Sequence, residues 1–558
     1  MAQKNSLPLI GLLGVAVIGS TIAVATNAIR MPSDNYAFFD PIVDVETLID
    51  GLYVEEPDLD KLQLGAINGM IEELNDPYTT FVPKRDTEKF SRDLTGEYVG
   101  IGAEVQIRDG WLTISSPLDG SPSWKAGVMA DDRVIKIDGE STEGQDIDDA
   151  IDRLIGEPNT KVVITVERGT ETLDIEITRG HIKVQAVKGF MRLDGDGAWE
   201  YVIDEDRNIG YIRLTQFTPK AALEIINAIS DTEQTTGKEL GGLILDLRFN
   251  PGGLLDEAVK IADMFIDEGT IVSTKGRVFK EHIEQAHKKN TIMDMPLIVL
   301  VNGQSASASE VLSGALSDHD RAVVIGTRSF GKGSVQTVRA LESGAGVLKI
   351  TEQYYYLPSG RLLHRRDDST SWGVDPTPGY YVPVSNEELG EMLTARRQQE
   401  ILTHTDAGDM VDIHNTDAAL EALKDPQLTA AVRVMQSRID TGVFEPVGIE
   451  ANAPDDVALA ELNALRNQEE RMLRELTRLY KRVEAVEGGI DDELAKENPK
   501  DFWDDDTDLT DGQIVIRDKD GNIVTTLKIT GDNLERWLID ADVEKVEQAE
   551  DSEADSDS

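Results

Sequence analysis

Two short apolar runs near the middle of the chain constrain its fold more than any other feature. Residues 242–247 read Gly-Leu-Ile-Leu-Asp-Leu, and residues 297–301 read Leu-Ile-Val-Leu-Val. A strand that is apolar on both faces belongs in a sheet that helices cover on both sides. Around these runs, residues 185–382 alternate strand-like and helix-like segments, including a strand that begins at Asn208 and a helix over residues 220–230. This alternation predicts an α/β core.

Residues 92–182 show a different pattern, in which short segments of alternating polar and apolar residues are separated by Gly, Asp and Pro. The alternation predicts strands, and their close spacing predicts a small domain made mostly of β-structure. A loop containing Gly100, Ile101 and Gly102 can present backbone N–H groups to a terminal carboxylate, and an open strand edge can accept a peptide as an added strand. An unrelated small β-barrel is the alternative.

The flanking regions are predicted to be mainly helical. Residues 40–90 carry apolar residues at spacings of three and four and break at Asp76-Pro77. Asp520-Gly521-Asn522 separates two strand-like runs and predicts a β-hairpin over residues 513–530. Beyond residue 384 the chain becomes acidic and helical. Apolar residues near its end follow a spacing that indicates either a coiled coil or an amphipathic helix packed on its own domain: Leu462, Leu465, Met472, Leu476, Leu479 and Val483.

The composition excludes several classes of function. The chain has 558 residues, which is too long for one hydrophobic core and predicts about two to four domains. Its formal net charge of −49 argues against nucleic acid binding, because a phosphate-binding surface needs clustered Lys and Arg. The chain has no cysteine, so disulfides and thiolate zinc sites are excluded.

An uncharged segment near the N-terminus, residues 7–29, lies between Lys4 and Arg30. Its length suits a membrane span of about 20 residues, while Ala23-Val24-Ala25 resembles a signal-peptidase site. Of these two interpretations we favour an uncleaved anchor over a cleaved signal peptide. In both cases the remaining chain is expected to be exported.

Residues 301–336 carry the clearest catalytic chemistry. A small-residue turn with three serines, Ser305, Ser307 and Ser309, opens a predicted helix. Attack of serine on an amide needs a positioned hydroxyl, a base and donors for the developing oxyanion, and a helix N-terminus favours negative charge beside it. A structural alternative is also open, because Ser307 and Glu310 form an S-x-x-E capping box.

Lys332 is the candidate base. It lies between two glycines on a loop, and the strand that is predicted to follow contains Gln336. A free lysine, with a pKa of about 10.4, is a poor base at neutral pH, but burial disfavours the ammonium and lowers that pKa. Residues two apart share a face of an extended chain, so Lys332 and Gln336 are expected to point the same way. The Gln336 amide can then hold the lysine amine.

The sequence supports neither a histidine base nor a metal site. His319 lies on the same predicted helix as Ser307, about 18 Å away at about 1.5 Å per residue, which is too far for a hydrogen bond. His319 and Asp318 are instead expected to cap the helix or bind neighbouring segments. The other histidines show no HExxH spacing, and His282 and His287 are predicted to lie on the solvated face of a charged helix.

The serine turn and the Gly-Lys-Gly loop together closely resemble the signature of the C-terminal processing peptidases, which are tail-specific serine proteases. In this family the nucleophile lies 25 residues before the lysine, as Ser307 does before Lys332. The resemblance therefore implies a Ser307–Lys332 dyad, with Gln336 orienting the lysine. It also implies an oxyanion hole made of backbone N–H groups, one from Ala308 and the other from Gly253 or, as the alternative, Gly252.

The resemblance covers about residues 40–435 and includes the β-rich segment, which is similar to a PDZ domain of the bacterial protease type. It implies that Gly100, Ile101 and Gly102 bind the peptide. In this family the PDZ domain often gates the active site, so Arg168 is a candidate for coupling that domain to the core, with a solvent-facing or salt-bridged arginine as the ordinary alternative. The segment Asp425-Pro426-Gln427-Leu428 resembles the closing helix motif of the family.

The predicted fold class is α/β, with a crotonase/Clp-like protease core, an inserted and mostly β PDZ domain, and helical N- and C-terminal regions. The expected segments are a signal peptide or membrane anchor (residues 1–30), a helical N-terminal region (40–91), a PDZ domain (92–183), an α/β serine protease core (184–383), a helical closing segment (384–440), an acidic helical region with a β-hairpin (441–545) and a disordered acidic tail (546–558).

These features predict an exported serine endopeptidase of the bacterial cell envelope or periplasm. Its expected partners are protein or peptide substrates with apolar C-termini, the membrane through the N-terminal segment, and a second copy or another protein through the C-terminal helices. No cofactor, metal or nucleic acid is expected. The competing interpretation is a catalytically silent PDZ scaffold that assembles envelope partners.

Overall fold

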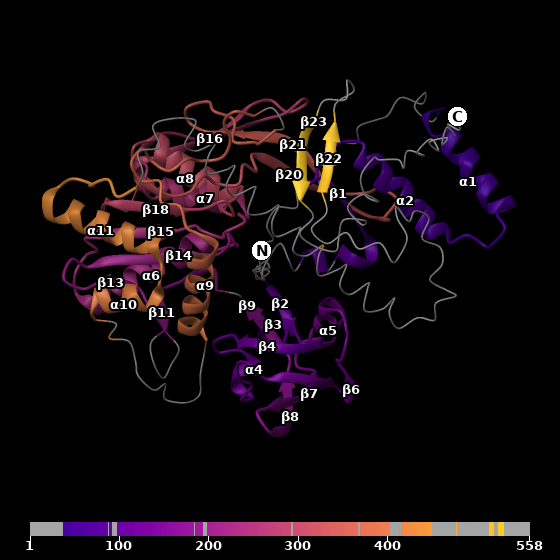
Figure 1. The fold of residues 1–558 in the computed structure, drawn as a ribbon, viewed down its shortest axis with the longest axis horizontal. Helices are drawn as coiled ribbons and strands as arrows, with labels where there is room; N and C mark the ends of the chain where they lie inside the picture. Colours follow the sequence, from indigo (N-terminus) through magenta and orange to yellow (C-terminus); the bar gives the residue numbers. More distant parts are fainter. Residues whose placement is uncertain are drawn as a thin grey trace, which may run out of the picture. The chain divides into compact units, whose positions relative to one another are not determined.

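The computed structural model describes the middle of the chain and a short part near its end. The described residues are 37–448, apart from 88, 92–96, 184, 193–197, 292–293, 367–368, 402–411 and 413, together with 476, 513–517 and 523–528. The chain divides into two units, Met1–Pro454 and Asp455–Ser558. Figure 1 shows the described helices and strands and labels most of them.

The core of the first unit is a sheet in which the central strands run parallel. The strand order is β10-β14-β15-β18-β19, and β13 pairs with β14. The pairs among β14, β15, β18 and β19 are parallel, whereas β10 and β13 pair with β14 in antiparallel fashion. These strands are β10 (Val187–Lys188), β13 (Val202–Asp204), β14 (Ile209–Leu214), β15 (Gly242–Asp246), β18 (Leu297–Val301) and β19 (Val323–Gly326).

Both faces of this sheet are buried, as the two apolar runs predict. On β18, Leu297 and Val299 pack into one apolar cluster, while Ile298 and Leu300 pack into another. The first cluster includes residues of α6, α7 and α8, and the second includes residues of α10 and α11. These helices are α6 (Ala221–Thr236), α7 (Leu255–Asp263), α8 (Ala308–Asp318), α10 (Thr416–Leu423) and α11 (Pro426–Thr441). The sheet is a middle layer between helices, which confirms the α/β class.

A second sheet, which is antiparallel, brings distant parts of the chain together. Its order is β1-β21-β16-β17, with β20 beside β21. Its strands are β1 (Thr80–Pro83), β16 (Glu268–Lys275), β17 (His282–His287), β20 (Ser334–Ala340) and β21 (Gly346–Tyr356). The prediction that His282 and His287 lie on a charged helix is wrong. They begin and end β17, an edge strand whose charged residues are mostly exposed, so its composition resembles that of a solvated helix.

The N-terminal part of the described chain is helical, as predicted, up to the break at Asp76-Pro77. It consists of α1 (Asp40–Leu52) and α2 (Leu59–Glu72), followed by β1. No helix in the part of the chain that the structure describes is both long and apolar enough to cross a membrane. Residues 7–29, on which the anchor prediction rests, lie outside the described residues.

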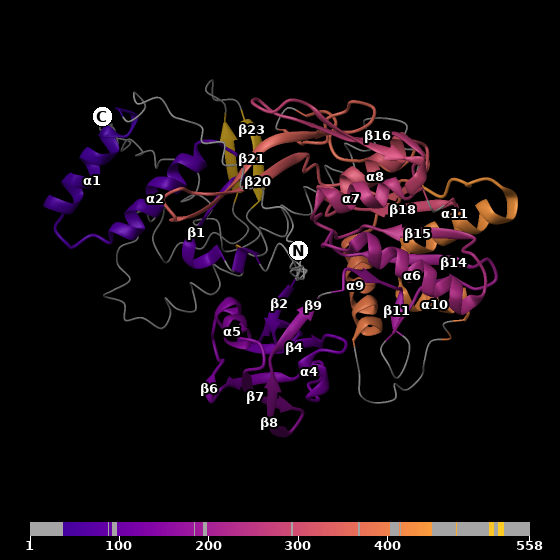
Figure 2. The ribbon, with the colours of Figure 1, turned by 180° about the vertical axis from the view of Figure 1, so that it is seen from behind.

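The inserted β-rich segment has its own sheet and core, seen from behind in Figure 2. The strand order is β3-β4-β5-β7-β8, with β6 beside β5, and β2 pairs separately with β9. Leu112, Val134 and Ile164 are fully buried in its core. The elements are β2 (Glu97–Gly100), β3 (Ala103–Arg108), β4 (Trp111–Pro117), α4 (Pro122–Lys125), β5 (Arg133–Ile137), β6 (Glu140–Ser141), α5 (Ile147–Leu154), β7 (Lys161–Arg168), β8 (Glu171–Thr178) and β9 (Gly180–Lys183). The prediction of an insert made mostly of β-structure is confirmed.

The remaining described elements are few. In the first unit, β11 (Met191–Arg192) pairs with β12 (Trp199–Glu200), and α9 (Asn386–Glu400) follows the core strands. In the second unit, β22 (Gln513–Arg517) and β23 (Ile523–Lys528) pair in antiparallel fashion, which confirms the predicted β-hairpin. Of the residues that predict a coiled coil, only Leu476 is described, and the acidic tail lies outside the described residues.

Candidate active site

Ser307 lies at the turn between β18 and α8 and is 7% exposed. Its backbone has φ 57° and ψ −114°, a conformation that residues with a side chain rarely adopt. It forms a capping box with Glu310, so the structural alternative is realised in this turn. The position also suits a nucleophile, because the N-terminus of α8 favours negative charge beside it. Burial raises the pKa of Tyr355 to about 12, and a hydrogen bond with the Ser307 side chain opposes that rise.

The hydroxyls of the other two serines are engaged in holding the turn. Ser305 Oγ donates to the carbonyl oxygen of Leu247 at 2.8 Å, and Ser309 Oγ donates to that of Asn250 at 3.0 Å. Both serine residues are fully buried. Their hydrogen bonds fasten the serine turn to the segment after β15, and they leave Ser307 as the best candidate nucleophile of the three.

The buried carboxylate of Glu310 joins the serine turn to the lysine loop. Its Oε2 accepts hydrogen bonds from the backbone N–H groups of Ser307 and Lys332, each at 2.8 Å. Its Oε1 accepts from Ser329 Oγ and from the N–H of Gly331, each at 2.6 Å. Burial raises the pKa of the Glu310 carboxyl, and these four hydrogen bonds act against that rise. One carboxylate oxygen thus links the backbones of the candidate nucleophile and the candidate base.

Lys332 is partly buried, and this changes its acidity. Burial lowers the pKa of the Lys332 amine, and the positive charge of Lys349 lowers it further, whereas the negative charges of Glu310 and Asp76 act in the opposite direction. The Nζ atom lies 5.0 Å from the centre of the Tyr78 ring. A lowered pKa makes the neutral amine available closer to pH 7, as a general base requires.

Gln336 lies on β20, and its described hydrogen bonds do not reach Lys332. Its Nε2 donates to Ser334 Oγ at 2.9 Å and to Thr351 Oγ1 at 3.2 Å. Ser334 and Gln336 share a face of the strand, as the two-residue alternation predicts. Lys332 precedes β20, which begins at Ser334, so the alternation does not extend to it. Gln336 therefore braces the start of the strand that follows the lysine loop.

The loop after β15 contains the candidate oxyanion donors. Gly252 has φ 103° and Gly253 has φ 142°, both in the region that favours glycine. A Cβ atom on Gly252 would lie 2.8 Å from Ser307 Cβ and 3.0 Å from the nitrogen of Ala308, so the loop touches the serine turn. The N–H of Gly252 donates to Asn250 Oδ1 at 2.9 Å. Within the described residues no acceptor is found for the N–H of Gly253 or of Ala308, which favours these two as donors.

A fully buried guanidinium supports the start of this loop. Arg248 donates to Asp246 at 2.9 and 2.6 Å and to Asp425 at 2.8 and 2.7 Å. Asp425 also accepts from the N–H of Leu428 and so caps α11. Burial alone would raise the pKa of both carboxyls, but the positive charge of Arg248 lowers each below its ordinary value. The motif at Asp425 that resembles the closing helix of the family therefore braces the loop that contains the candidate oxyanion donors.

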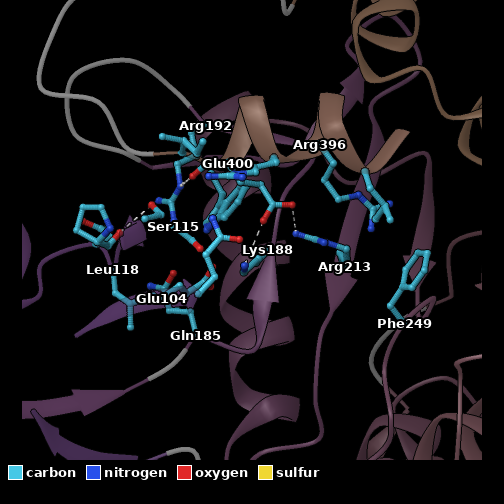
Figure 3. Close-up of a pocket in the computed structure, with 18 residues that line it drawn as sticks. Glu104, Ser115, Leu118, Gln185, Lys188, Arg192, Arg213, Phe249, Arg396 and Glu400 are labelled. Atoms are coloured by element: carbon cyan, nitrogen blue, oxygen red, sulfur yellow. Dashed lines mark hydrogen bonds and ion pairs between the residues drawn. The ribbon is translucent and has the colours of Figure 1, made fainter. Parts of the chain in front are cut away.

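Helix α9 contacts a residue of this loop and carries a second charged cluster (Figure 3). The guanidinium of Arg396 lies 5.7 Å from the centre of the Phe249 ring. At the end of α9, Glu400 pairs with Lys188 at 3.3 Å and with Arg213, and Figure 3 shows the Glu400 carboxylate close to both cations. These contacts tie α9 to β10 and β14.

The residues predicted to bind the peptide lie together in the β-rich domain. Gly100 ends β2, and Ile101 and Gly102 connect it to β3; Gly102 has φ 74°. Arg168 ends β7 and binds the buried carboxylate of Asp132, with Nε–Oδ1 and Nη2–Oδ2 distances of 2.7 Å each. Of the alternatives for Arg168, the geometry favours a salt bridge within its own domain.

His319 is engaged with neighbouring segments, as expected for a residue at the end of α8. Its Nε2 lies 2.7 Å from the carbonyl oxygen of Thr270. Asp318 Oδ2 accepts from the N–H of Ser359 at 2.9 Å. Both residues therefore bind nearby strands and turns at the opposite end of the helix from Ser307.

Sequence reasoning missed two contributions to the site. Glu310 was identified only as part of a capping box, although the S-x-x-E spacing did place a carboxylate beside the candidate nucleophile. Asp76 was identified only as part of a helix break, and Tyr78 was assigned no role in the site. No local signal pairs them with Lys332, because the contact arises from strand pairing between distant parts of the chain.

Comparisons with known proteins find relatives over most of the chain. Residues 208–377 match the model of peptidase family S41, residues 113–168 match a PDZ domain, and residues 24–86 match the N-terminal domain of the activating protease CtpB. A carboxy-terminal-processing protease of Bartonella bacilliformis is 36% identical over 443 residues, which cover 78% of this chain and 96% of that protein. A probable CtpA-like serine protease of Staphylococcus aureus is 37% identical over 341 residues, which cover 61% and 65%. The solved structure of a photosystem II D1 C-terminal processing protease is 28% identical, with 62% of this chain and 88% of that chain covered and a TM-score of 0.36.

Proposed function

The chain belongs to peptidase family S41 and is a serine-type peptidase of the carboxy-terminal-processing kind, and we propose that Ser307 and Lys332 are its catalytic dyad. The observation that carries this proposal is the Glu310 carboxylate, one oxygen of which accepts from the backbone N–H groups of both residues. The lowered pKa of Lys332 gives further support, because a general base must be unprotonated at the working pH.

In the proposed mechanism the neutral amine of Lys332 takes the proton of Ser307 Oγ as that oxygen attacks the carbonyl carbon of the scissile peptide bond. The tetrahedral intermediate carries negative charge on the former carbonyl oxygen, which the N–H groups of Gly253 and Ala308 stabilise. The Lys332 ammonium protonates the departing nitrogen, and the C–N bond breaks to leave an acyl ester on Ser307. Water then gives a proton to the same amine as its oxygen attacks the ester carbon. The bond to Ser307 Oγ breaks, Ser307 takes its proton back from the Lys332 ammonium, and the released carboxylic acid gives its own proton to solvent and becomes a carboxylate.

The remaining residues of the site act by holding these groups. The ion pairs of Arg248 with Asp246 and Asp425 keep the oxyanion loop in place. Gln336 acts through Ser334 and keeps the start of β20 fixed after the lysine loop. Preorganised donors of this kind lower the barrier because they need not reorient during the reaction.

Substrate capture is assigned to the PDZ domain. The loop of Gly100, Ile101 and Gly102 binds the terminal carboxylate of an apolar protein tail, and the bound tail adds as a strand. The name of the Bartonella relative, a carboxy-terminal-processing protease, supports protein substrates that are cut near the C-terminus. The uncharged segment of residues 7–29 supports export to the cell envelope, where it tethers the chain or is removed.

Cleavage of two versions of one unfolded protein tests this function. One version ends in an apolar, uncharged tail and the other in an acidic tail, and a free apolar peptide is added in a parallel series to occupy the PDZ domain. Wild type is expected to cleave the apolar version faster. Ser307→Ala and Lys332→Ala are each expected to lower the turnover number by about 10⁴-fold or more.

The matched control is Lys61→Ala, which removes an exposed lysine of α2 and is expected to cleave like wild type. Cleavage that survives Ser307→Ala and Lys332→Ala contradicts the dyad. Equal cleavage of both versions contradicts selection by the tail. A substrate that stays intact with wild type, even when the PDZ domain is occupied, would favour the scaffold interpretation.

A further inference from the structure

The turn of residues 76–79 is built rigidly by one side chain. Asp76 Oδ1 accepts from the N–H of Tyr78 at 3.0 Å, and Asp76 Oδ2 accepts from Thr79 Oγ1 at 2.6 Å. An aspartate that bonds to the backbone two residues later fixes a tight turn. The direction of the Tyr78 side chain is therefore set within the turn itself.

Strand pairing fastens this turn to the catalytic half of the molecule. β1 begins at Thr80 and pairs with β21, with Thr80 opposite Lys349. Next to this pairing, the N–H of Thr351 donates to Thr79 Oγ1 at 3.1 Å. Thr351 Oγ1 is the group that accepts from Gln336. One residue of β21 thus contacts both the turn and the brace that follows the lysine loop.

The Tyr78 ring lies against the Lys332 amine. The distance from Nζ to the ring centre is 5.0 Å. Next to the ring, the imidazole of His364 has its centre 6.2 Å from that of Tyr78. The chain is also crowded beside the lysine, because a Cβ atom on Gly333 would lie 2.2 Å from the nitrogen of His364. The amine therefore lies beside the Tyr78 ring, and the backbone of the next residue in its loop is packed tightly against that of His364.

We propose that Tyr78, which the N-terminal segment contributes, is a positioning residue for Lys332, and that its ring keeps bulk water from one side of the amine. This inference rests on the proposed role of Lys332 as the base. Asp76 and Thr79 hold the ring in place, and they do so through their own hydrogen bonds and the pairing of β1 with β21. The N-terminal segment is therefore part of the catalytic centre and not only a separate helical module.

The charges around the amine make the proposal testable by pH. Removing the ring admits water, which favours the ammonium, but it also removes the ring face, which attracts the ammonium. Burial is the largest cause of the lowered pKa of Lys332, so we expect the entry of water to dominate and this pKa to rise toward the ordinary lysine value. Lys349 on β21 faces the amine and favours its neutral form, while Glu310 of α8 and Asp76 favour the ammonium. Burial raises the pKa of the Tyr78 phenol, which therefore remains neutral at pH 7.

His364 is another titratable group beside the Tyr78 ring, and its protonation affects the activity profile only at low pH. Burial and the neighbouring Arg366 lower its pKa, while Asp76 opposes them. His364 is therefore neutral above pH 7. A displacement of the activity profile above pH 7 then reports on the lysine.

The experiment compares the pH profiles of kcat/KM for the full chain and its variants on the unfolded protein with the apolar tail. The acidic limb is the part of the profile in which kcat/KM rises with pH as the Lys332 amine loses its proton. Tyr78→Ala is expected to move this limb to higher pH by about one unit. It should lower kcat/KM at pH 7 by about tenfold, because one pKa unit is a tenfold change in the fraction of free amine. Tyr78→Phe keeps the ring and is expected to keep the wild-type limb. The matched control is Tyr53→Ala, since Tyr53 follows α1 and is 60% exposed.

Asp76→Asn provides a variant with an effect of opposite sign. It removes a negative charge that favours the ammonium, so the acidic limb is expected at lower pH than in wild type. General loss of stability cannot produce shifts in both directions, and circular dichroism checks that each variant is folded. If Tyr78→Ala does not fold, Tyr78→Val takes its place, because it keeps an apolar side chain but uncovers one side of the amine. The same upward shift is expected, and a limb at the wild-type position would overturn the proposal.

The outcomes separate this inference from the dyad itself. A loss of kcat/KM by the same factor at every pH in Tyr78→Ala overturns the positioning role and leaves the dyad standing. An upward shift in Tyr78→Phe overturns the ring as the responsible group. Activity that survives Lys332→Ala overturns the dyad and this inference together.

Discussion

Two turns in this chain share the S-x-x-E spacing and differ in almost every other respect. Ser307 and Glu310 open α8, Ser385 and Glu388 open α9, and both pairs form a capping box. Ser385 has the ordinary N-cap backbone, with φ −68° and ψ 162°, and its Oγ accepts from the N–H of Glu388 at 3.2 Å. Ser307 has φ 57° and ψ −114° and is buried beneath neighbouring loops.

The two glutamates show what the difference means. Glu388 is exposed, and the hydrogen bond from the N–H of Ser385 lowers its carboxyl pKa. Glu310 is fully buried, and burial raises its carboxyl pKa. Glu310 also accepts hydrogen bonds from the backbone of the lysine loop. Among the described residues, no second loop donates to Glu388 in this way. A local cap becomes part of a candidate active site when a second loop donates to the same carboxylate.

The largest expected effect distinguishes the two serines. Ser307→Ala is expected to lower kcat by about 10⁴-fold or more, with little change in the free energy of unfolding, because the N–H of Glu310 also donates to the backbone oxygen of Ser307 at 2.9 Å. Ser385→Ala is expected to leave kcat unchanged and to lower the free energy of unfolding by about 1 kcal/mol, the usual contribution of an N-cap hydroxyl. Turnover and urea denaturation of the full chain measure both quantities. The same loss of kcat in both variants would contradict the comparison.

The next effect distinguishes the two glutamates. In Glu310→Gln the new NH₂ group faces N–H and O–H groups that donate to the carboxylate in wild type, so some of these donors lose their acceptor. Each buried donor left without an acceptor costs about 1–3 kcal/mol. We expect the free energy of unfolding to fall by about 2–4 kcal/mol and cleavage to fall with it, since Lys332 loses its link to the serine turn. Glu388→Gln is exposed and is expected to change stability by less than about 0.5 kcal/mol. Urea denaturation compares the two variants, and equal losses would show that both turns are simple caps.

The smallest expected effect is a shift in the pH profile. Only the neutral amine accepts a proton, and burial lowers the pKa of Lys332, so kcat/KM should rise with pH through a limb that lies below the ordinary lysine range. The charge of Glu310 favours the ammonium. The residual activity of Glu310→Gln should therefore have its limb at lower pH, while the limb of Glu388→Gln stays at the wild-type position. A limb in the ordinary lysine range, or one that moves upward in Glu310→Gln, is the result that contradicts this assignment.

Much of the fold was predictable because its signals are local. The apolar runs at residues 242–247 and 297–301 predict strands buried on both faces, and their residues lie in two apolar clusters on opposite faces of the sheet. The Asp520-Gly521-Asn522 turn predicts a hairpin, and β22 pairs with β23. The segment His282–His287 was assigned the wrong element, because an exposed edge strand and a solvated helix can carry the same charged residues.

The candidate site was predictable only in part. The S-x-x-E turn and the glycine-flanked lysine are short patterns, so Ser307 and Lys332 could be chosen from the sequence and its resemblance to a family. The groups that contact them come from distant segments. Asp425 reaches Arg248 across the chain, and Tyr78 reaches Lys332 through the pairing of β1 with β21.

By itself, the sequence determined most of the elements, with the edge strand at His282–His287 as an exception, and it determined which side chains can carry the chemistry. Strand burial, turns and capping depend on residues that are neighbours in the chain. The tertiary structure decided which of the two S-x-x-E turns is joined to a lysine loop and which is only a helix cap. It did so because a carboxylate shared by two loops, a lowered lysine pKa and a ring over an amine all depend on burial. Burial depends on how distant segments pack, and the spacing of residues in the chain does not show it.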